Sequence, residues 1–197
     1  MRLFLAVKPD RPAEALLGRR LMDVQAAVGD EARSLKWTPA TNLHITLHFL
    51  GEVPQARVAH VIETVQRTLA EDPFEVALGG VGVYPAAGAP RVVWLDVVGG
   101  GEALGRAHTE LGRRLTEGGF PIESRALSPH VTVARVPDKA RAHVKQLRER
   151  LHELESRRSL GEGGPIAWVA ERVILFRSDL SGSVPRYEGL HDVELAR

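Results

Sequence analysis

The sequence predicts an α+β fold built from two lobes related by a pseudo-twofold axis. Each lobe is expected to have a largely antiparallel sheet, helices on the outside, and a His-x-Thr strand that faces a central groove. The segments 43–50 and 130–135 both alternate polar and apolar residues with the period of a half-buried strand, and both contain His-x-Thr. The order strand, helix, strand, helix, strand also occurs twice, at about 1–85 and 90–197. The 197 residues are therefore expected to form a single two-lobed domain.

The main alternative is a doubly wound parallel sheet with helices on both faces. Strands in such a sheet are buried on both sides and read as continuous apolar runs. The strands predicted here alternate, which favours sheets with one face against the core.

Individual elements follow from apolar residues at every third or fourth position in helices and every second position in strands, with Gly and Pro at the boundaries. The first repeat contains a strand at 3–7, a helix that opens at Asp10 and Pro12 and ends near Gly29, a loop at 30–42, the strand at 43–50, a helix at about 55–70 and a strand at about 74–83. The second contains a strand at 91–98, a helix opening at 99–101, the 130–135 strand, a long helix opening at 137–138, a loop at 161–165, a strand at about 167–177 and a short strand at about 187–195.

Composition excludes several classes of protein. Twenty-six Lys and Arg against 25 Asp and Glu give a net charge of +1, too little for a protein that coats long nucleic acid, although one terminal phosphate remains a compatible ligand. The chain has no cysteine, which excludes disulfides and thiolate sites and agrees with a reducing cytoplasm. Its N-terminal apolar run stops at Lys8 and Pro9, too short for a signal peptide, and no apolar run is long enough to span a bilayer.

The two His-x-Thr motifs are the candidate catalytic residues. On a strand, His44 and Thr46 share one face about 6–7 Å apart, and His130 and Thr132 do the same in the second copy. Two imidazoles in one cleft can supply a general acid and a general base at neutral pH, and threonine hydroxyls can donate to an anionic oxygen. Arg135, at the exit of the second strand, is a candidate phosphate ligand.

A metal site is a weaker interpretation. His44 and His48 have the helical spacing of a zinc pair, but on a strand they lie about 13 Å apart, so no metal or other cofactor is expected. His48 is instead expected at the solvated end of its strand. His108 falls on an apolar helical stripe and is expected to be a partly buried structural residue.

The two motifs resemble the paired HxTx signatures of the 2H phosphoesterase superfamily, and their surroundings resemble its LigT-like branch, the RNA 2′,3′-cyclic phosphodiesterases. The resemblance covers essentially the whole chain. It rests on the segments Arg2–Val7, Asn42–Gly51, Arg91–Trp94, Ser128–Arg135, Leu175–Ser178 and Tyr187–Glu188. Val133 stands where leucine is common, a conservative departure in the core.

The resemblance implies metal-independent opening of 2′,3′-cyclic phosphate ends of RNA to 2′-phosphates, with reverse 2′,5′ ligation as a side activity. His44 and His130 are then the catalytic pair, with His44 as general acid to the 3′ oxygen and His130 as general base for water. Thr46, Thr132 and Arg135 hold the phosphate.

Other functions remain open at this point. The same site could act on 2′,5′-linked oligonucleotides or small cyclic nucleotides, and a non-catalytic binder of RNA ends could retain the fold. The intact pair of histidines argues against a pure binder, which has no need of two imidazoles. The expected partner is an RNA 3′ end or a short nucleotide, without membrane contact, and the expected state is a cytoplasmic monomer.

Overall fold

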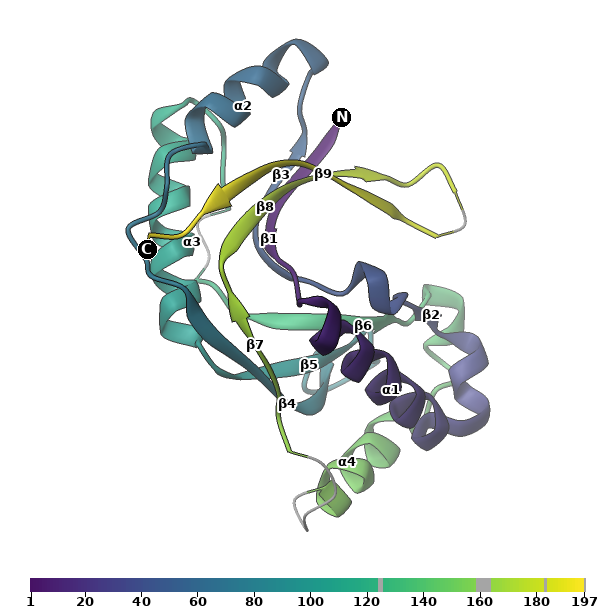
Figure 1. Cartoon of the computed structure of the whole chain (residues 1–197). Coiled ribbons are helices and arrows are strands. Elements are labelled where there is room, and N and C mark those ends of the chain that lie inside the picture. The colour runs from purple at the N-terminus through teal and green to yellow at the C-terminus, as the bar shows by residue number, and fades with distance from the viewer. Residues whose placement is uncertain (124–125, 159–163, 183, 197) are drawn as a thin grey trace.

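The computed structural model describes residues 1–123, 126–158, 164–182 and 184–196, and confirms a mixed fold of helices and antiparallel strands (Figure 1). The strands are β1 (Arg2–Val7), β2 (Lys36–Trp37), β3 (Ile45–Glu52), β4 (Phe74–Tyr84), β5 (Val92–Gly99), β6 (His130–Arg135), β7 (Ile166–Ala170), β8 (Arg172–Asp179) and β9 (Arg186–Glu194). The α-helices are α1 (Arg11–Val28), α2 (Val58–Val65), α3 (Gly101–Glu117) and α4 (Leu147–Arg158). Short 3-10 turns lie at Gly29–Ser34, Ala40–Asn42, Gln55–Arg57 and Asp138–Ala140.

The strands form one curled sheet. Its order is β7-β4-β5-β6-β3-β1-β8-β9, the short β2 pairs with β6, and all strand pairs are antiparallel. The two halves join where β3 pairs with β6 through Ile45 and Val131. From the sequence, two separate sheets that face each other were expected. In the structure the halves meet edge to edge, and each half takes strands from both repeats.

Helices cover the outer side of the curl (Figure 1). Helix α1 packs with α4 against β4 and β7, while α2 packs with α3, which in turn contacts β3. On β1, Leu3, Leu5 and Val7 point into the core beneath the helices. The alternate residues Phe4 and Ala6 form a smaller cluster with Phe176 on the opposite face, which is called the inner face below. Both faces of β1 are therefore buried, but by different partners.

Helix α1 forms as the apolar stripe predicts. Leu17, Leu21, Val24 and Val28 are buried, and the Asp10 carboxylate caps the helix by accepting from the Ala13 amide at 2.8 Å. A side-chain oxygen at this position satisfies an amide that has no partner within the helix, which stabilises it by about 1 kcal/mol. This cap fixes the point at which the chain leaves β1.

Helix α2 is shorter than predicted, since it ends at Val65 rather than near residue 70. The guanidinium of Arg114, which is 5% exposed, donates to the carbonyls of Val65 at 3.2 Å and Thr68 at 2.9 Å, and also to that of Arg67. The Val65 carbonyl is one of those that a helix end leaves unpaired, and the Arg67 and Thr68 carbonyls belong to the segment just beyond the helix. A buried cation from α3 therefore binds the chain where it leaves α2, which local sequence could not reveal.

Two other predicted elements are divided. The helix expected from 137–138 begins as a 3-10 turn at Asp138–Ala140, and α4 proper starts only at Leu147. The strand expected at 167–177 is two strands, because the chain crosses at Glu171 from β7, which pairs with β4, to β8, which pairs with β1. In the loop expected at 161–165, residues 161–163 lie outside the described residues. Among the described helices, none has both the length and the apolar character needed to cross a membrane.

Candidate active site

The two His-x-Thr motifs lie on neighbouring strands. The pair Ile45 and Val131 consists of the middle residues of the two motifs, and the strands run antiparallel. This register sets His44 across from Thr132 and Thr46 across from His130. The two histidines are then diagonal neighbours, a relation that corresponds to about 7–8 Å between strands. The β3–β6 pairing that joins the two halves of the sheet therefore also brings the two motifs together.

Both motifs are followed by a β-bulge at the same position. In the β1–β3 pair, Leu5 is opposite His48 while Ala6 is opposite Thr46, so Leu47 is an extra residue on β3. In the β5–β6 pair, Val93 is opposite Ala134 while Trp94 is opposite Thr132, so Val133 is extra on β6. A bulge shifts the alternation of side chains by one residue.

The bulge at Val133 explains the position of Arg135. Strict alternation would put a residue three positions after Thr132 on the other face. With the extra residue, Ala134 is fully buried and Arg135 returns to the face of Thr132. The guanidinium there is close enough to act on the pKa values of His44 and Tyr187. The structure thus brings the predicted phosphate ligand beside the predicted histidines.

The bulge at Leu47 overturns the expectation for His48. That residue was expected to be solvated, but it is 4% exposed, and its ring stacks on His108 at 4.1 Å between centroids. Its Nε2 donates to the His108 carbonyl at 2.7 Å. Burial lowers the pKa of both imidazoles, and the His108 carbonyl opposes that shift at His48. His108 is partly buried as predicted, while His44 and His48 lie on opposite faces and cannot share a metal ion.

The catalytic candidates are anchored in the same way. His44 Nδ1 lies 2.7 Å from the carbonyl oxygen of Asn42, and His130 Nδ1 lies 2.7 Å from that of Ser128. A carbonyl only accepts, so each ring donates through Nδ1–H. In the neutral form Nε2 then carries a lone pair, and in the charged form it carries a proton. Each Nε2 can therefore accept or donate one proton without loss of the anchor.

The surroundings of His44 are aromatic and cationic. Its ring packs 4.9 Å from Phe4 and lies edge-on to Tyr187 at 5.2 Å. Burial lowers the pKa of His44, and the charges of Arg135, His130 and Lys8 lower it further, against the raising effect of the Asn42 carbonyl. Burial also raises the pKa of Tyr187, although Arg135 opposes this.

His130 has a different environment. Its side chain is exposed, the ring of Trp94 lies edge-on at 6.4 Å, and Asp96 is directly opposite on β5. No catalytic or binding role was expected from the sequence for Trp94, Tyr187 or Asp96. The period-two pattern of β5 gives a signal for Trp94, since it places that residue on the polar face. For Tyr187 the strand pattern gives no comparable signal, because β9 reaches His44 only through β8 and β1, and only the family resemblance pointed to that segment.

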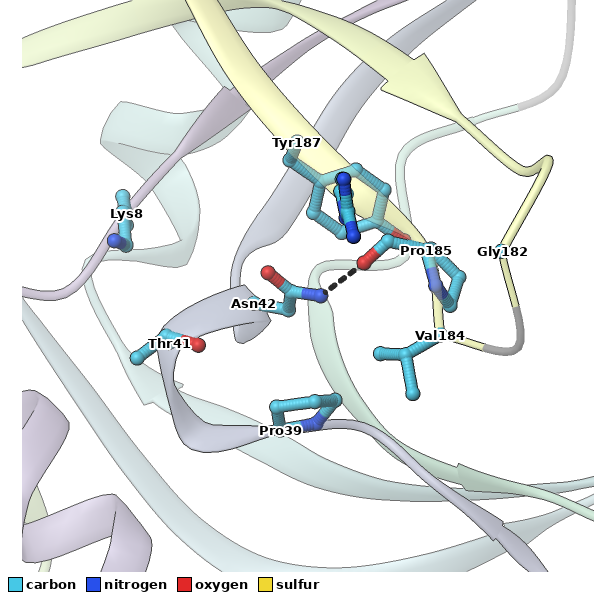
Figure 2. A pocket seen from close by; sticks show the side chains of 9 residues that line it. Lys8, Pro39, Thr41, Asn42, Gly182, Val184, Pro185 and Tyr187 are labelled. Atoms are coloured by element: carbon cyan, nitrogen blue, oxygen red, sulfur yellow. Dashed lines mark hydrogen bonds between the residues drawn. The ribbon is translucent and has the colours of Figure 1, made fainter.

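A pocket of about 580 Å³ is lined in part by Asn42 and Tyr187 (Figure 2), and both of these residues contact His44. It lies between the end of the β8–β9 hairpin and the turn before β3, and Asn42 Nδ2 ties the two together by donating to the Pro185 carbonyl at 2.7 Å. Its lining residues are Lys8, Pro39, Thr41, Asn42, Gly182, Val184, Pro185, Arg186 and Tyr187. Among the described residues, no group of three or more His, Cys, Asp or Glu side chains is arranged to hold a metal ion.

Comparisons with known proteins agree with this geometry. A family model described as the 2′-5′ RNA ligase superfamily matches residues 9–181. A protein of Aeropyrum pernix named RNA 2′,3′-cyclic phosphodiesterase is 32% identical over 179 residues, which are 90% of this chain and 96% of that protein.

Solved structures show the same fold. The protein TT0787 of Thermus thermophilus matches with a TM-score of 0.71 and 26% identity, over 98% of this chain and 97% of that one. E. coli LigT in complex with 3′-AMP matches with a TM-score of 0.72 and 20% identity, over 100% and 98% of the respective chains. The resemblance inferred from the two motifs is confirmed: the chain is a 2H phosphoesterase and belongs to the 2′-5′ RNA ligase superfamily.

Proposed function

We propose that this protein hydrolyses the 2′,3′-cyclic phosphate at the 3′ end of RNA to a 2′-phosphate, by a two-histidine acid–base mechanism. One observation carries the proposal: both imidazoles are anchored through Nδ1 at 2.7 Å, on neighbouring strands, beside two threonines and an arginine. The relatives named for this reaction support the choice of substrate.

The reaction requires two proton transfers. His130 Nε2 takes a proton from water as the water oxygen attacks phosphorus and forms a new P–O bond. The P–O3′ bond breaks, and His44 Nε2 gives its proton to the departing 3′ oxygen. The phosphate remains on O2′, and the two rings exchange protons with solvent before the next cycle. In-line attack needs the base and the acid on opposite sides of phosphorus, which agrees with the diagonal placement of the two histidines.

The assignment of His44 as the acid is supported by its surroundings. A lower pKa makes an imidazolium a stronger proton donor, but it also leaves fewer rings protonated in the free protein. A bound cyclic phosphate carries one negative charge and offsets the nearby charge of Arg135. Substrate binding therefore raises the pKa of His44, so that the ring is protonated when it has to donate its proton.

Charge on the phosphate is held by Thr46, Thr132 and Arg135. The two hydroxyls can each donate to a non-bridging oxygen, and the guanidinium supplies a permanent positive charge. Fixed donors of this kind stabilise the charge that grows in the transition state. Acid, base and charge stabilisation are then all supplied by side chains, so we propose that the reaction needs no metal. All five residues belong to one chain, and we propose that this chain acts as one catalytic domain and as a monomer.

Ligation, the reverse of 2′,5′ cleavage, is a second activity of the same site. If the 5′ hydroxyl of another RNA takes the place of water, His130 accepts its proton as the oxygen attacks phosphorus, the P–O3′ bond breaks, and His44 protonates O3′. The two RNA ends are then joined through a 2′,5′ linkage. The name of the matched family favours this possibility. High concentrations of both ends would be required, because water competes for the phosphate.

The test is turnover of a short RNA with a 2′,3′-cyclic phosphate in the presence of EDTA. Native protein is compared with His44→Ala and His130→Ala, and the isomer of the product is identified. We expect a 2′-phosphate from the native protein and a loss of roughly 10²–10⁴-fold in each variant, the range for removal of a general acid or base. No turnover by folded native protein would exclude the proposal. A 3′-phosphate product would show that O2′, and not O3′, is the leaving oxygen.

A further inference from the structure

The pocket beside His44 has a cationic lining that the proposed reaction does not use. Two of its lining residues contact His44, since the Asn42 carbonyl accepts from His44 and the ring of Tyr187 lies 5.2 Å from the His44 ring. Lys8 and Arg186 contribute positive charge to its wall (Figure 2 labels Lys8). Its volume of about 580 Å³ is in the range of pockets that hold ligands of nucleotide size.

The opposite side of the active site carries the opposite charge. On β1, Ala6 is opposite Thr46, and on β5 Trp94 is opposite Thr132. Two residues after Ala6 the chain, just beyond the end of β1, reaches Lys8, and two residues after Trp94 β5 reaches Asp96. The two histidines therefore have a lysine beside one and an aspartate beside the other. An anionic chain that extends from the reacting phosphate is attracted to the His44 side and repelled from the His130 side.

The chemistry of the substrate selects the same side. In a 2′,3′-cyclic phosphate the leaving O3′ is on C3′, whose neighbour C4′ carries C5′ and the next phosphodiester of the RNA. The nucleobase is on C1′, beyond C2′. If His44 protonates O3′, the C4′–C5′ side of the ribose points toward His44. The phosphodiester on the 5′ side of the terminal nucleotide then lies toward the pocket.

We propose that this pocket is a binding site for the phosphodiester immediately upstream of the cyclic phosphate, with Arg186 as its main cationic ligand. The site selects oligonucleotide ends over mononucleoside 2′,3′-cyclic phosphates, and it rests on the proposed function. Arg186 is chosen over Lys8, although Arg186 faces Asp179 on β8, because Lys8 Nζ is held by the Glu14 carboxylate at 3.2 Å. Lys8 also acts on the pKa of His44, so its replacement would disturb catalysis directly.

The experiment compares three substrates: a mononucleoside 2′,3′-cyclic phosphate, a dinucleotide with the same cyclic end, and that dinucleotide with a neutral methylphosphonate linkage. Each is assayed with the native protein, with Arg186→Gln, and with Arg172→Gln as a matched control. The two arginines lie at opposite ends of the β8–β9 ladder: in the strand register Arg186 is across from Asp179, and Arg172 is across from Glu194. Arg172 is therefore an arginine of the same hairpin that lies far from the pocket.

For the native protein we expect kcat/KM to be roughly 10-fold higher for the dinucleotide than for the mononucleoside or the methylphosphonate, the size of one charge-assisted hydrogen bond. Arg186→Gln should remove that advantage and leave mononucleoside turnover unchanged, and the methylphosphonate should cause no further loss in this variant. Arg172→Gln should behave like the native protein. The advantage should also shrink as the salt concentration rises.

Equal kcat/KM for the dinucleotide and its methylphosphonate would overturn the upstream site and leave the reaction intact. Independent losses from Arg186→Gln and from the methylphosphonate would also overturn it, because the two changes would then act on different contacts. Failure of native protein to open any of the three substrates would instead count against the proposed function. The two proposals therefore fail in different ways.

Discussion

The two His-x-Thr regions have nearly the same backbone but different neighbours. In both, the histidine Nδ1 donates to the carbonyl two residues earlier, and in both an extra residue follows the threonine, Leu47 in one and Val133 in the other. Five residues after the histidine, however, the first region places Phe49 on the inner face and the second places Arg135. The shared backbone geometry directs equivalent side chains to the same face. The residue type at each equivalent position then determines which chemical group that half of the sheet presents there.

The same contrast extends to the rings and charges around each histidine. His44 is packed among Phe4 and Tyr187, whereas His130 is exposed beside Trp94. A symmetric site would give two imidazoles with equal properties, but acid–base catalysis needs one ring of each kind at the start of the reaction. The differences between the two regions are therefore the features on which the proposed roles of the two histidines rest.

The largest difference is expected at the fifth position after each histidine. Arg135→Gln removes the permanent positive charge and should lower kcat/KM by roughly 10²–10³-fold, as for loss of one donor to a developing oxyanion. Phe49→Leu changes the equivalent residue of the first region and should cost less than about 10-fold, because it removes no charge. The steady-state kinetics of both variants check this. Similar losses of kcat/KM in the two variants would show that the positive charge at position 135 does not distinguish the two regions.

The threonines should behave as an equivalent pair. Thr46→Val and Thr132→Val keep the branched shape but remove the hydroxyl, and each should lower kcat/KM by roughly 10-fold for one lost hydrogen bond. The fit of the strand should be retained, because valine is also a good strand former. Thermal unfolding of both variants provides the control. A loss in only one of them would restrict phosphate binding to one motif.

The smallest effect concerns stability. Position 48 is a buried histidine in the first region, while its counterpart in the second is Ala134. Burial lowers the folded-state pKa of His48 and His108, so near neutral pH both are uncharged, and the unfolded chain binds more protons as the pH falls. Stability should therefore decrease as the pH drops through the ordinary pKa of about 6.5 toward the lowered folded value.

We expect this decrease to be measurable between about pH 7.5 and 5.5, the range in which the unfolded chain takes up protons on its histidines. Denaturant unfolding at several pH values measures it. His108→Gln removes one ring of this pair and should reduce the dependence, while His44, whose pKa burial also lowers, contributes equally in both proteins. If the variant loses as much stability as the native protein over that range, the histidine pair is not its source.

The sequence was sufficient to predict the inner-face positions of His44, Thr46 and Thr132, because these depend only on the period of a strand. It could not predict that His48 turns into the core, because the bulge at Leu47 is set by pairing with β1. Gly112 on α3 completes that arrangement, since a Cβ there would lie 3.1 Å from the His48 ring.

Long-range features were likewise outside the reach of local patterns. The end of α2 depends on Arg114, 49 residues from the Val65 carbonyl that it binds. Tyr187 meets His44 only because β8 and β9 join the half of the sheet that starts at β3. Periodicity predicts which residues of a segment share a face, but the partner of that face is decided by topology.

The central claim is that His44 acts as the acid at the 3′ oxygen and His130 as the base for water. Its most direct test uses an RNA end in which the bridging 3′ oxygen of the cyclic phosphate is replaced by sulfur, a leaving group that needs no protonation. Turnover of this substrate by His44→Ala should return to within about 10-fold of the native protein, while His130→Ala should remain inactive, because loss of a general base costs roughly 10²–10⁴-fold. Rescue of His130→Ala instead of His44→Ala would contradict the assignment.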